Sequence, residues 1–141
     1  MAYNLLIASK QGSINTSNNI MKKLIYVLED DEDIREILSI FFSDFDLEVR
    51  TFEDIKGFKK VMKTSIPDLY ILDINLPDGN GLDLADYLAA TDSTRNIPIL
   101  LMSAHMNTVD IINSKFVSGF IQKPFDLYFM KNKVMELLAA S

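Results

Sequence analysis

The chain has 141 residues and a formal net charge of −6, with 48% hydrophobic and 24% charged residues. This length and balance fit one globular domain whose core needs no metal or disulfide to fold. The absence of cysteine excludes disulfides, thiolate zinc sites and a cysteine nucleophile. The acidic charge argues against a nucleic-acid-binding module, which normally presents a basic face.

The first residues differ from the rest of the chain. The polar run 11–19 offers little to bury, so we expect a flexible leader over 1–22 and one domain over 23–141. A docking segment built on residues 5–7 is the alternative. No basic segment precedes this short apolar stretch, as a signal peptide requires, and no apolar run approaches the ~18 residues of a membrane span. We therefore expect a cytoplasmic protein without membrane contacts.

From residue 24 onward, two kinds of apolar spacing alternate. Short apolar runs predict strands at 24–28, 47–52, 69–72, 97–102 and 119–122. Apolar residues at helical spacing predict helices at 34–41, 55–62, 82–90, 107–115 and 127–138. Residues 77–81 form a turn cluster between the third strand and the third helix. Five such alternations predict an α/β fold, with a parallel sheet covered by helices on both faces.

Polar residues follow four of the predicted strands, where ligands bind in an open parallel sheet. These residues are Glu29, Asp30, Asp73, Ser103 and Lys123. Clustered carboxylates repel one another and must share protons or hold a cation. Because the available ligands are oxygens, Mg²⁺ is the expected ion. With a hydroxyl and a lysine beside it, the cluster favours a phosphoryl-transfer site with an aspartyl nucleophile.

Four segments carry a resemblance to a known family. The segments LEDDEDIR (28–35), LDINLPDG (72–79), LMSAH (101–105) and FIQKPF (120–125) are similar to the signatures of the response-regulator receiver domain. The similarity extends over about residues 23–138. It implies a flavodoxin-like, doubly wound (βα)5 fold with a five-stranded parallel sheet in the order 2-1-3-4-5.

The resemblance also implies roles for particular residues. Asp73 would accept a phosphoryl group from a histidine kinase or phosphotransfer protein. Glu29, Asp30, Asp73 and the backbone carbonyl of Asn75 would hold Mg²⁺. Lys123 would pair with a phosphoryl oxygen. The chain would then act in two-component signalling as a CheY-like receiver without its own output domain.

Other residues would respond to phosphorylation or limit its lifetime. Ser103 would turn inward to a phosphoryl oxygen and Phe120 would rotate as the switch aromatic, although a core role for Phe120 is the alternative. Asn75 and His105 would tune hydrolysis, unless His105 is an ordinary loop histidine. By the same resemblance, the Lys123–Pro124 peptide bond is expected to be cis.

Two other functions compete with this interpretation. A pseudo-receiver would bind partners without phosphorylation. A haloacid-dehalogenase-like phosphatase would need an acid two residues after the nucleophile, where this chain has Asn75, and metal-binding acids after it rather than before it. We therefore expect no enzyme beyond autocatalytic phosphorylation and dephosphorylation. Its partners would be a phosphodonor and an unknown downstream protein, and it would be a monomer or a phosphorylation-dependent dimer.

Overall fold

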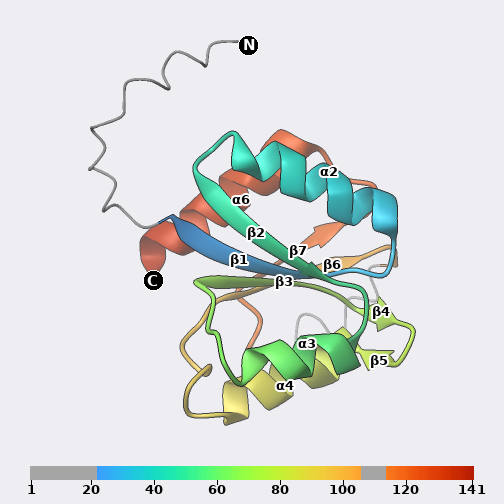
Figure 1. Ribbon diagram of the computed structural model, residues 1–141, viewed down its shortest axis with the longest axis vertical. Helices are drawn as coiled ribbons and strands as arrows, with labels where there is room; N and C mark the ends of the chain where they lie inside the picture. Colours follow the sequence, from blue (N-terminus) through green and yellow to red (C-terminus); the bar gives the residue numbers. More distant parts are fainter. Residues whose placement is uncertain (1–21, 106–113) are drawn as a thin grey trace.

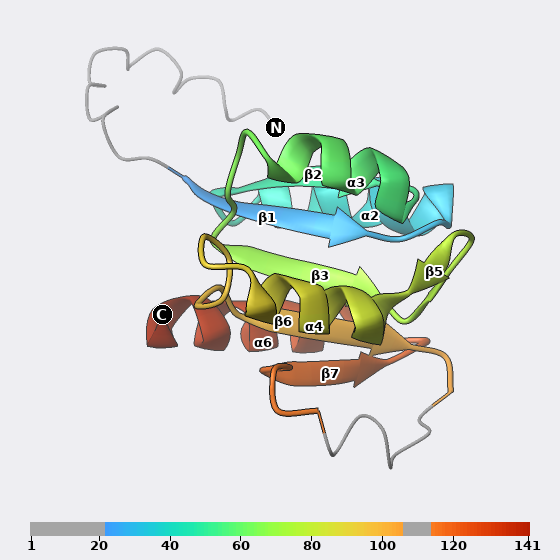
Figure 2. The same ribbon diagram turned by 90° about the horizontal axis from the view of Figure 1, so that it is seen from below.

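The computed structural model describes residues 22–105 and 114–141. Five parallel strands form one sheet in the order β2-β1-β3-β6-β7 (Figure 2). Their bounds are β1 Lys23–Leu28, β2 Leu47–Phe52, β3 Leu69–Asp73, β6 Ile99–Ser103 and β7 Gly119–Gln122. Counting only these five strands along the chain, the order is 2-1-3-4-5, which confirms the predicted fold class.

Helices cover both faces of the sheet (Figure 1). One face carries α2 (Glu32–Ser43) and α6 (Leu127–Ala140), and the other carries α3 (Ile55–Met62) and α4 (Gly81–Ala90). The helix predicted over 107–115 falls on residues outside the described ones, except for Ser114 and Lys115, which are not helical.

The two faces of the sheet bury two separate cores, which explains why the strands are continuous apolar runs in the sequence. In β1, Ile25 and Val27 belong to the core under α2 and α6, whereas Tyr26 and Leu28 belong to the other core. All five residues of β3, and all five of β6, are buried. The sheet is therefore a rigid platform whose strand ends hold their polar residues in place.

Within residues 22–105 and 114–141, each of the four helices begins after a side chain that accepts a backbone N–H of the first turn. These N-cap residues are Asp31, Asp54, Asn80 and Asp126. The acidic residues that follow β1 therefore have different roles. Asp31 caps α2, and its two predecessors, Glu29 and Asp30, remain for the site.

The predicted turn cluster contains a small antiparallel pair, β4 (Asn75–Leu76) and β5 (Gly79–Asn80). At its tip, the Asp78 carboxylate accepts the N–H groups of Ile55 at 2.9 Å and Lys56 at 3.0 Å. The hydrogen bond from Ile55 holds the pKa of Asp78 below its usual value. The loop that follows Asp73 is therefore anchored to the start of α3.

Candidate functional site

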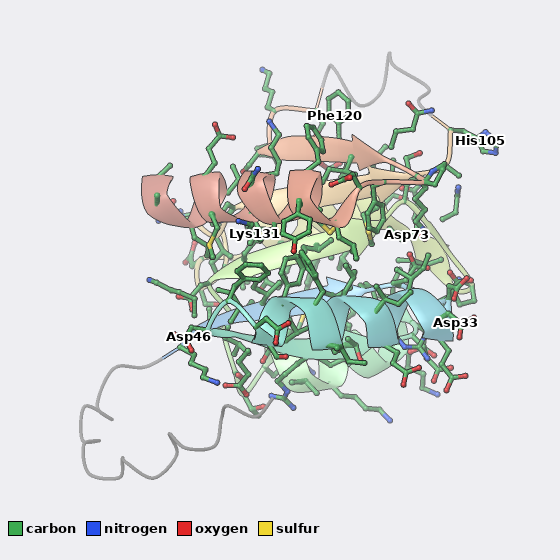
Figure 3. The ribbon with its side chains drawn as sticks, turned by 90° about the horizontal axis from the view of Figure 1, so that it is seen from above. Asp33, Asp46, Asp73, His105, Phe120 and Lys131 are labelled. Atoms are coloured by element: carbon green, nitrogen blue, oxygen red, sulfur yellow. The ribbon has the colours of Figure 1, made fainter. Side chains whose placement is uncertain are left out.

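Asp73 ends β3, the central strand of the sheet, and is almost fully buried. Its Oδ2 accepts a hydrogen bond from Lys123 Nζ at 2.7 Å, and its Oδ1 accepts one from the Asn75 N–H at 3.2 Å. A Cβ at Gly81 would overlap the Asp73 carbonyl oxygen, so the start of α4 lies directly against this strand end. Figure 3 shows Asp73 toward the end of the sheet where α2 begins, nearer to Asp33 than to Asp46.

Lys123 joins carboxylates from two strands. Its ammonium lies 2.5 Å from Glu29 Oε1 and 2.7 Å from Asp73 Oδ2. Burial by itself lowers the pKa of Lys123, but the hydrogen bonds and charges of Asp73 and Glu29 outweigh that effect and raise it. Lys123 therefore stays charged, and it brings the ends of β1, β3 and β7 together.

Glu29 is completely buried. Its Oε2 accepts the Asp31 N–H at 3.0 Å. Its Oε1 accepts no hydrogen bond of good geometry from the described residues, although the Lys123 ammonium lies close to it. Desolvation by burial raises the pKa of Glu29 to about 7, against the lowering effect of Lys123. The site thus contains a fully buried carboxylate whose only cationic partner among the described residues is Lys123.

One carboxylate oxygen each from Glu29, Asp30 and Asp73 lies within 4.8 Å of the others. Hard oxygen donors of this kind suit Mg²⁺, which binds through one or two carboxylates and keeps several waters. The exposure of Asp30 leaves such waters a way in. The residues present therefore fit the expected ion.

We expect the metal-free protein to lose stability as pH rises toward neutrality. The pKa of Glu29 is about 7 in the folded protein against 4.5 for the free side chain, so the folded state binds this proton more tightly. This contribution is complete below the lower pKa and is lost as pH rises through the higher one. Urea unfolding in the presence of a chelator would measure the loss. An unchanged pH profile in Glu29→Gln would contradict this origin.

Ser103 ends β6 and is buried. Its hydroxyl donates a hydrogen bond to the His105 carbonyl at 2.6 Å and accepts one from the His105 N–H at 3.1 Å. The hydroxyl is thus engaged with the loop that follows β6 rather than with the carboxylates of the site. The His105 side chain itself is exposed at the same edge as Asp73 (Figure 3).

Phe120 lies on β7 with 37% of its surface exposed and points away from α6 (Figure 3). The alternative that it is a core aromatic is therefore wrong: its neighbour Ile121 is the β7 residue that packs into the core. The Lys123–Pro124 bond is cis, as expected from the resemblance.

Arg35 is a residue whose role the sequence did not reveal. Its guanidinium donates to the carbonyls of Glu29 and Asp30, the two acids that follow β1. The only sequence signal for this role was that Arg35 follows an acidic run. A basic residue at that position could equally have been an ordinary surface charge. The contact exists because α2 turns back over the end of β1.

An apolar groove lies beside the site. Its volume is about 500 Å³, and Lys123 stands among its lining residues. The apolar part of the lining comes from α2, from the loops after β6 and β7, and from the start of α6: Ile34, Ile37, Leu38, Ala104, Pro124, Phe125 and Leu127. Across the described residues, none of the helices has the length and apolar character needed to cross a membrane.

The chain shares its sequence pattern and its fold with known proteins. A family model described as the response regulator receiver domain matches residues 25–135. The chain is 27% identical over 115 residues to the response regulator protein PilR of Pseudomonas aeruginosa, covering 82% of this chain and 25% of PilR. It is 29% identical over 123 residues to the transcriptional regulatory protein CssR of Bacillus subtilis, and the match covers 84% of this chain and 53% of CssR. The chain thus spans a quarter to about half of these relatives.

Among solved structures, the response regulator TrrA of Thermotoga maritima, crystallised with Mg²⁺ and BeF, superposes with a TM-score of 0.72. The two are 28% identical, and the match covers 82% of this chain and 98% of that one.

Proposed function

Because the chain belongs to the response regulator receiver domain family, we propose that it is a phosphorylation switch with Asp73 as the phosphoryl acceptor. The observation that carries this proposal is the meeting of three strand-end groups. The Lys123 ammonium lies within 2.7 Å of both Asp73 and Glu29, at the edge where Asp30 is also present. Receivers act in two-component signalling and are not enzymes in the usual sense, and a cytoplasmic location is part of the proposal.

The proposed reaction forms an acyl phosphate on Asp73. A carboxylate oxygen of Asp73 attacks the phosphorus of a phosphohistidine, the P–N bond breaks, and its electron pair leaves with the imidazole. Lys123 offsets the negative charge on the phosphoryl oxygens, as preorganised cations do in phosphoryl transfer. Ser103 donates its O–H to one of these oxygens.

Glu29, Asp30, Asp73 and the Asn75 backbone carbonyl would hold Mg²⁺ at this edge. When bound, the ion neutralises charge that develops on the transferred phosphoryl group. Because burial raises the pKa of Glu29 to about 7, its carboxyl must lose a proton before it can serve as a ligand. Cation binding and ionisation of Glu29 therefore occur together.

The hydrogen bonds of Ser103 support a switching role for this residue. Its single O–H cannot donate both to the His105 carbonyl and to a phosphoryl oxygen, so phosphorylation competes with the present contact. Phe120, exposed in this structure, would rotate inward and bias a pre-existing equilibrium between two conformations. A downstream protein, or a second copy of the chain, would bind the changed surface.

The apolar groove supports a protein as the phosphodonor. A phosphohistidine must come within bonding distance of Asp73, and the groove offers an apolar contact surface beside Lys123. A histidine kinase or a histidine phosphotransfer protein has the chemistry to dock there. Nucleic acid has no place in this proposal, given the net charge of −6.

The direct test is intact-mass spectrometry after incubation with acetyl phosphate, with and without Mg²⁺. We expect one phosphoryl adduct that requires Mg²⁺. If no adduct forms and beryllofluoride also fails to bind, the chain is a pseudo-receiver. Continuous hydrolysis of a phosphate monoester would instead indicate the phosphatase alternative, which the position of Asn75 disfavours.

We propose that His105 and Asn75 tune the lifetime of the phosphoryl group. In the His105→Ala variant we expect a longer phosphoryl half-life, because an exposed imidazole at the rim can orient the attacking water. The change should stay below the ~100-fold that general-base catalysis typically contributes. Decay of the phosphorylated species, followed by intact mass after donor removal, would measure it. An unchanged half-life would assign His105 to the ordinary loop role.

A further inference from the structure

Arg35 holds the backbone between β1 and α2. Its Nη1 donates to the carbonyl oxygens of Glu29 and Asp30, both at 2.9 Å. On the other side, the Glu29 N–H donates to the Phe52 carbonyl of β2 at 3.0 Å. The short segment that carries the acid pair is therefore held from α2 and from the neighbouring strand.

Asp30 depends on this clamp more than the other two acids do. The Glu29 carboxylate is held by the Asp31 N–H and by Lys123. The Asp73 carboxylate is held by Lys123 and by a backbone N–H of its own loop. The Asp30 carboxylate is exposed and, among the described residues, contacts the Glu29 carboxyl but no backbone N–H and no basic side chain, so its position follows largely from its backbone.

We propose that Arg35 is a positioning residue for the cation site: its bridge to two successive carbonyls keeps the Asp30 carboxylate beside those of Glu29 and Asp73. The inference rests on the proposed function of that site. Arginine suits this task because its guanidinium is planar, permanently charged and presents several donors in a rigid arrangement. A single neutral donor would hold both carbonyls less firmly.

Removal of Arg35 should change the Mg²⁺ affinity, and the direction of that change distinguishes a positioning role of Arg35 from one of charge balance alone. The positive charge of Arg35 repels a divalent cation at the acid cluster. If Arg35 only balanced the acidic charge, its removal would strengthen Mg²⁺ binding. If it positions Asp30, its removal weakens Mg²⁺ binding despite the more favourable electrostatics.

The experiment measures Mg²⁺ binding by isothermal titration calorimetry in the full chain, at constant pH and ionic strength. We expect Arg35→Ala to raise the Mg²⁺ Kd by about tenfold or more, the usual effect of removing a group that orients a metal ligand. Arg35→Lys keeps the charge but replaces the planar guanidinium with a shorter, more flexible ammonium side chain, so its Kd should lie in between. The rate of phosphorylation by acetyl phosphate should recover toward wild type at saturating Mg²⁺.

Two control variants separate this effect from loss of charge or stability elsewhere. Arg95→Ala removes an exposed arginine that pairs with Asp92, and it should keep the wild-type Kd. Thr94→Ala removes a buried hydroxyl that donates to the Leu88 carbonyl at 2.7 Å, so it destabilises the protein without touching the site. Its Mg²⁺ Kd should also be that of wild type.

Each outcome decides the matter. An Arg35→Ala Kd equal to or below that of wild type overturns the positioning role, as does an equal rise in Thr94→Ala. If Arg35→Ala does not fold, the Kd of Arg35→Lys decides, and a wild-type value overturns the inference. If the wild-type chain binds no Mg²⁺, the proposed function fails and this inference fails with it.

Discussion

The Asp73→Asn variant is expected to gain no phosphoryl group from acetyl phosphate under conditions in which the wild type is fully modified. The amide cannot act as the carboxylate nucleophile that lies between Lys123 and the Asn75 N–H. Intact-mass spectrometry would show the loss as a missing adduct. This is the largest effect we expect from a single substitution, since it removes the reacting group itself.

The variant should remain folded. The substituted amide keeps an oxygen for the Asn75 N–H, and the loss of one buried negative charge relieves repulsion on Glu29. Asp92→Asn is the matched control, because Asp92 is highly exposed and lies outside the carboxylate cluster of the site. It should be modified as the wild type is. An adduct that persists in a folded Asp73→Asn protein would place the acceptor elsewhere.

The Lys123→Met variant should be the most destabilised of the site variants. Among the described residues, Lys123 is the only side chain that pairs with the carboxylates of both Glu29 and Asp73, and these are both buried. Removal of one partner from a buried ionic cluster typically costs about 3–5 kcal/mol. One of the two acids can take up a proton instead, so we expect a loss near the lower end, about 3 kcal/mol, that grows as pH rises.

Chemical unfolding in the presence of a chelator would measure this loss, and added Mg²⁺ should restore part of it because a cation again faces the acids. The rate of phosphorylation should fall by at least about a hundredfold, as when one preorganised electrostatic contact to a transition state is removed. Lys133→Met removes a partly exposed lysine of α6 and should change stability by less than about 0.5 kcal/mol. Equal stability of Lys123→Met and wild type would contradict the bridging role of Lys123.

The strands were predictable because burial on both faces forces them to be apolar. The runs around Ile25, Leu72 and Leu101 consist almost entirely of apolar residues, and each lies in the sheet as expected. Their boundaries differ from the predicted ones by one or two residues: β3 includes Asp73 itself, and β6 begins at Ile99, after Pro98. The sequence indicates only a turn where the pair β4–β5 forms, since two residues on each side carry no periodic signal.

The chemistry of the site was also predictable in part. Carboxylates, a hydroxyl and a lysine that directly follow apolar strands must converge if the sheet is parallel, whatever the details of packing. Sequence order alone could not show that Asp31 serves as a helix cap, that Ser103 is bound to the backbone of His105, or that Phe120 is exposed. These facts depend on how each loop turns after its strand.

By itself, the sequence determined the alternation of strands and helices, the family and the residue types at the sheet edge, because these follow from local periodicity and chain order. The tertiary structure alone decided which charges meet. Lys123 lies 50 residues from Asp73 along the chain, and only the crossover that places β7 beside β6 brings its ammonium between Asp73 and Glu29. The burial that raises the pKa of Glu29 to about 7, and the clamp from Arg35, likewise arise only when separate segments pack together.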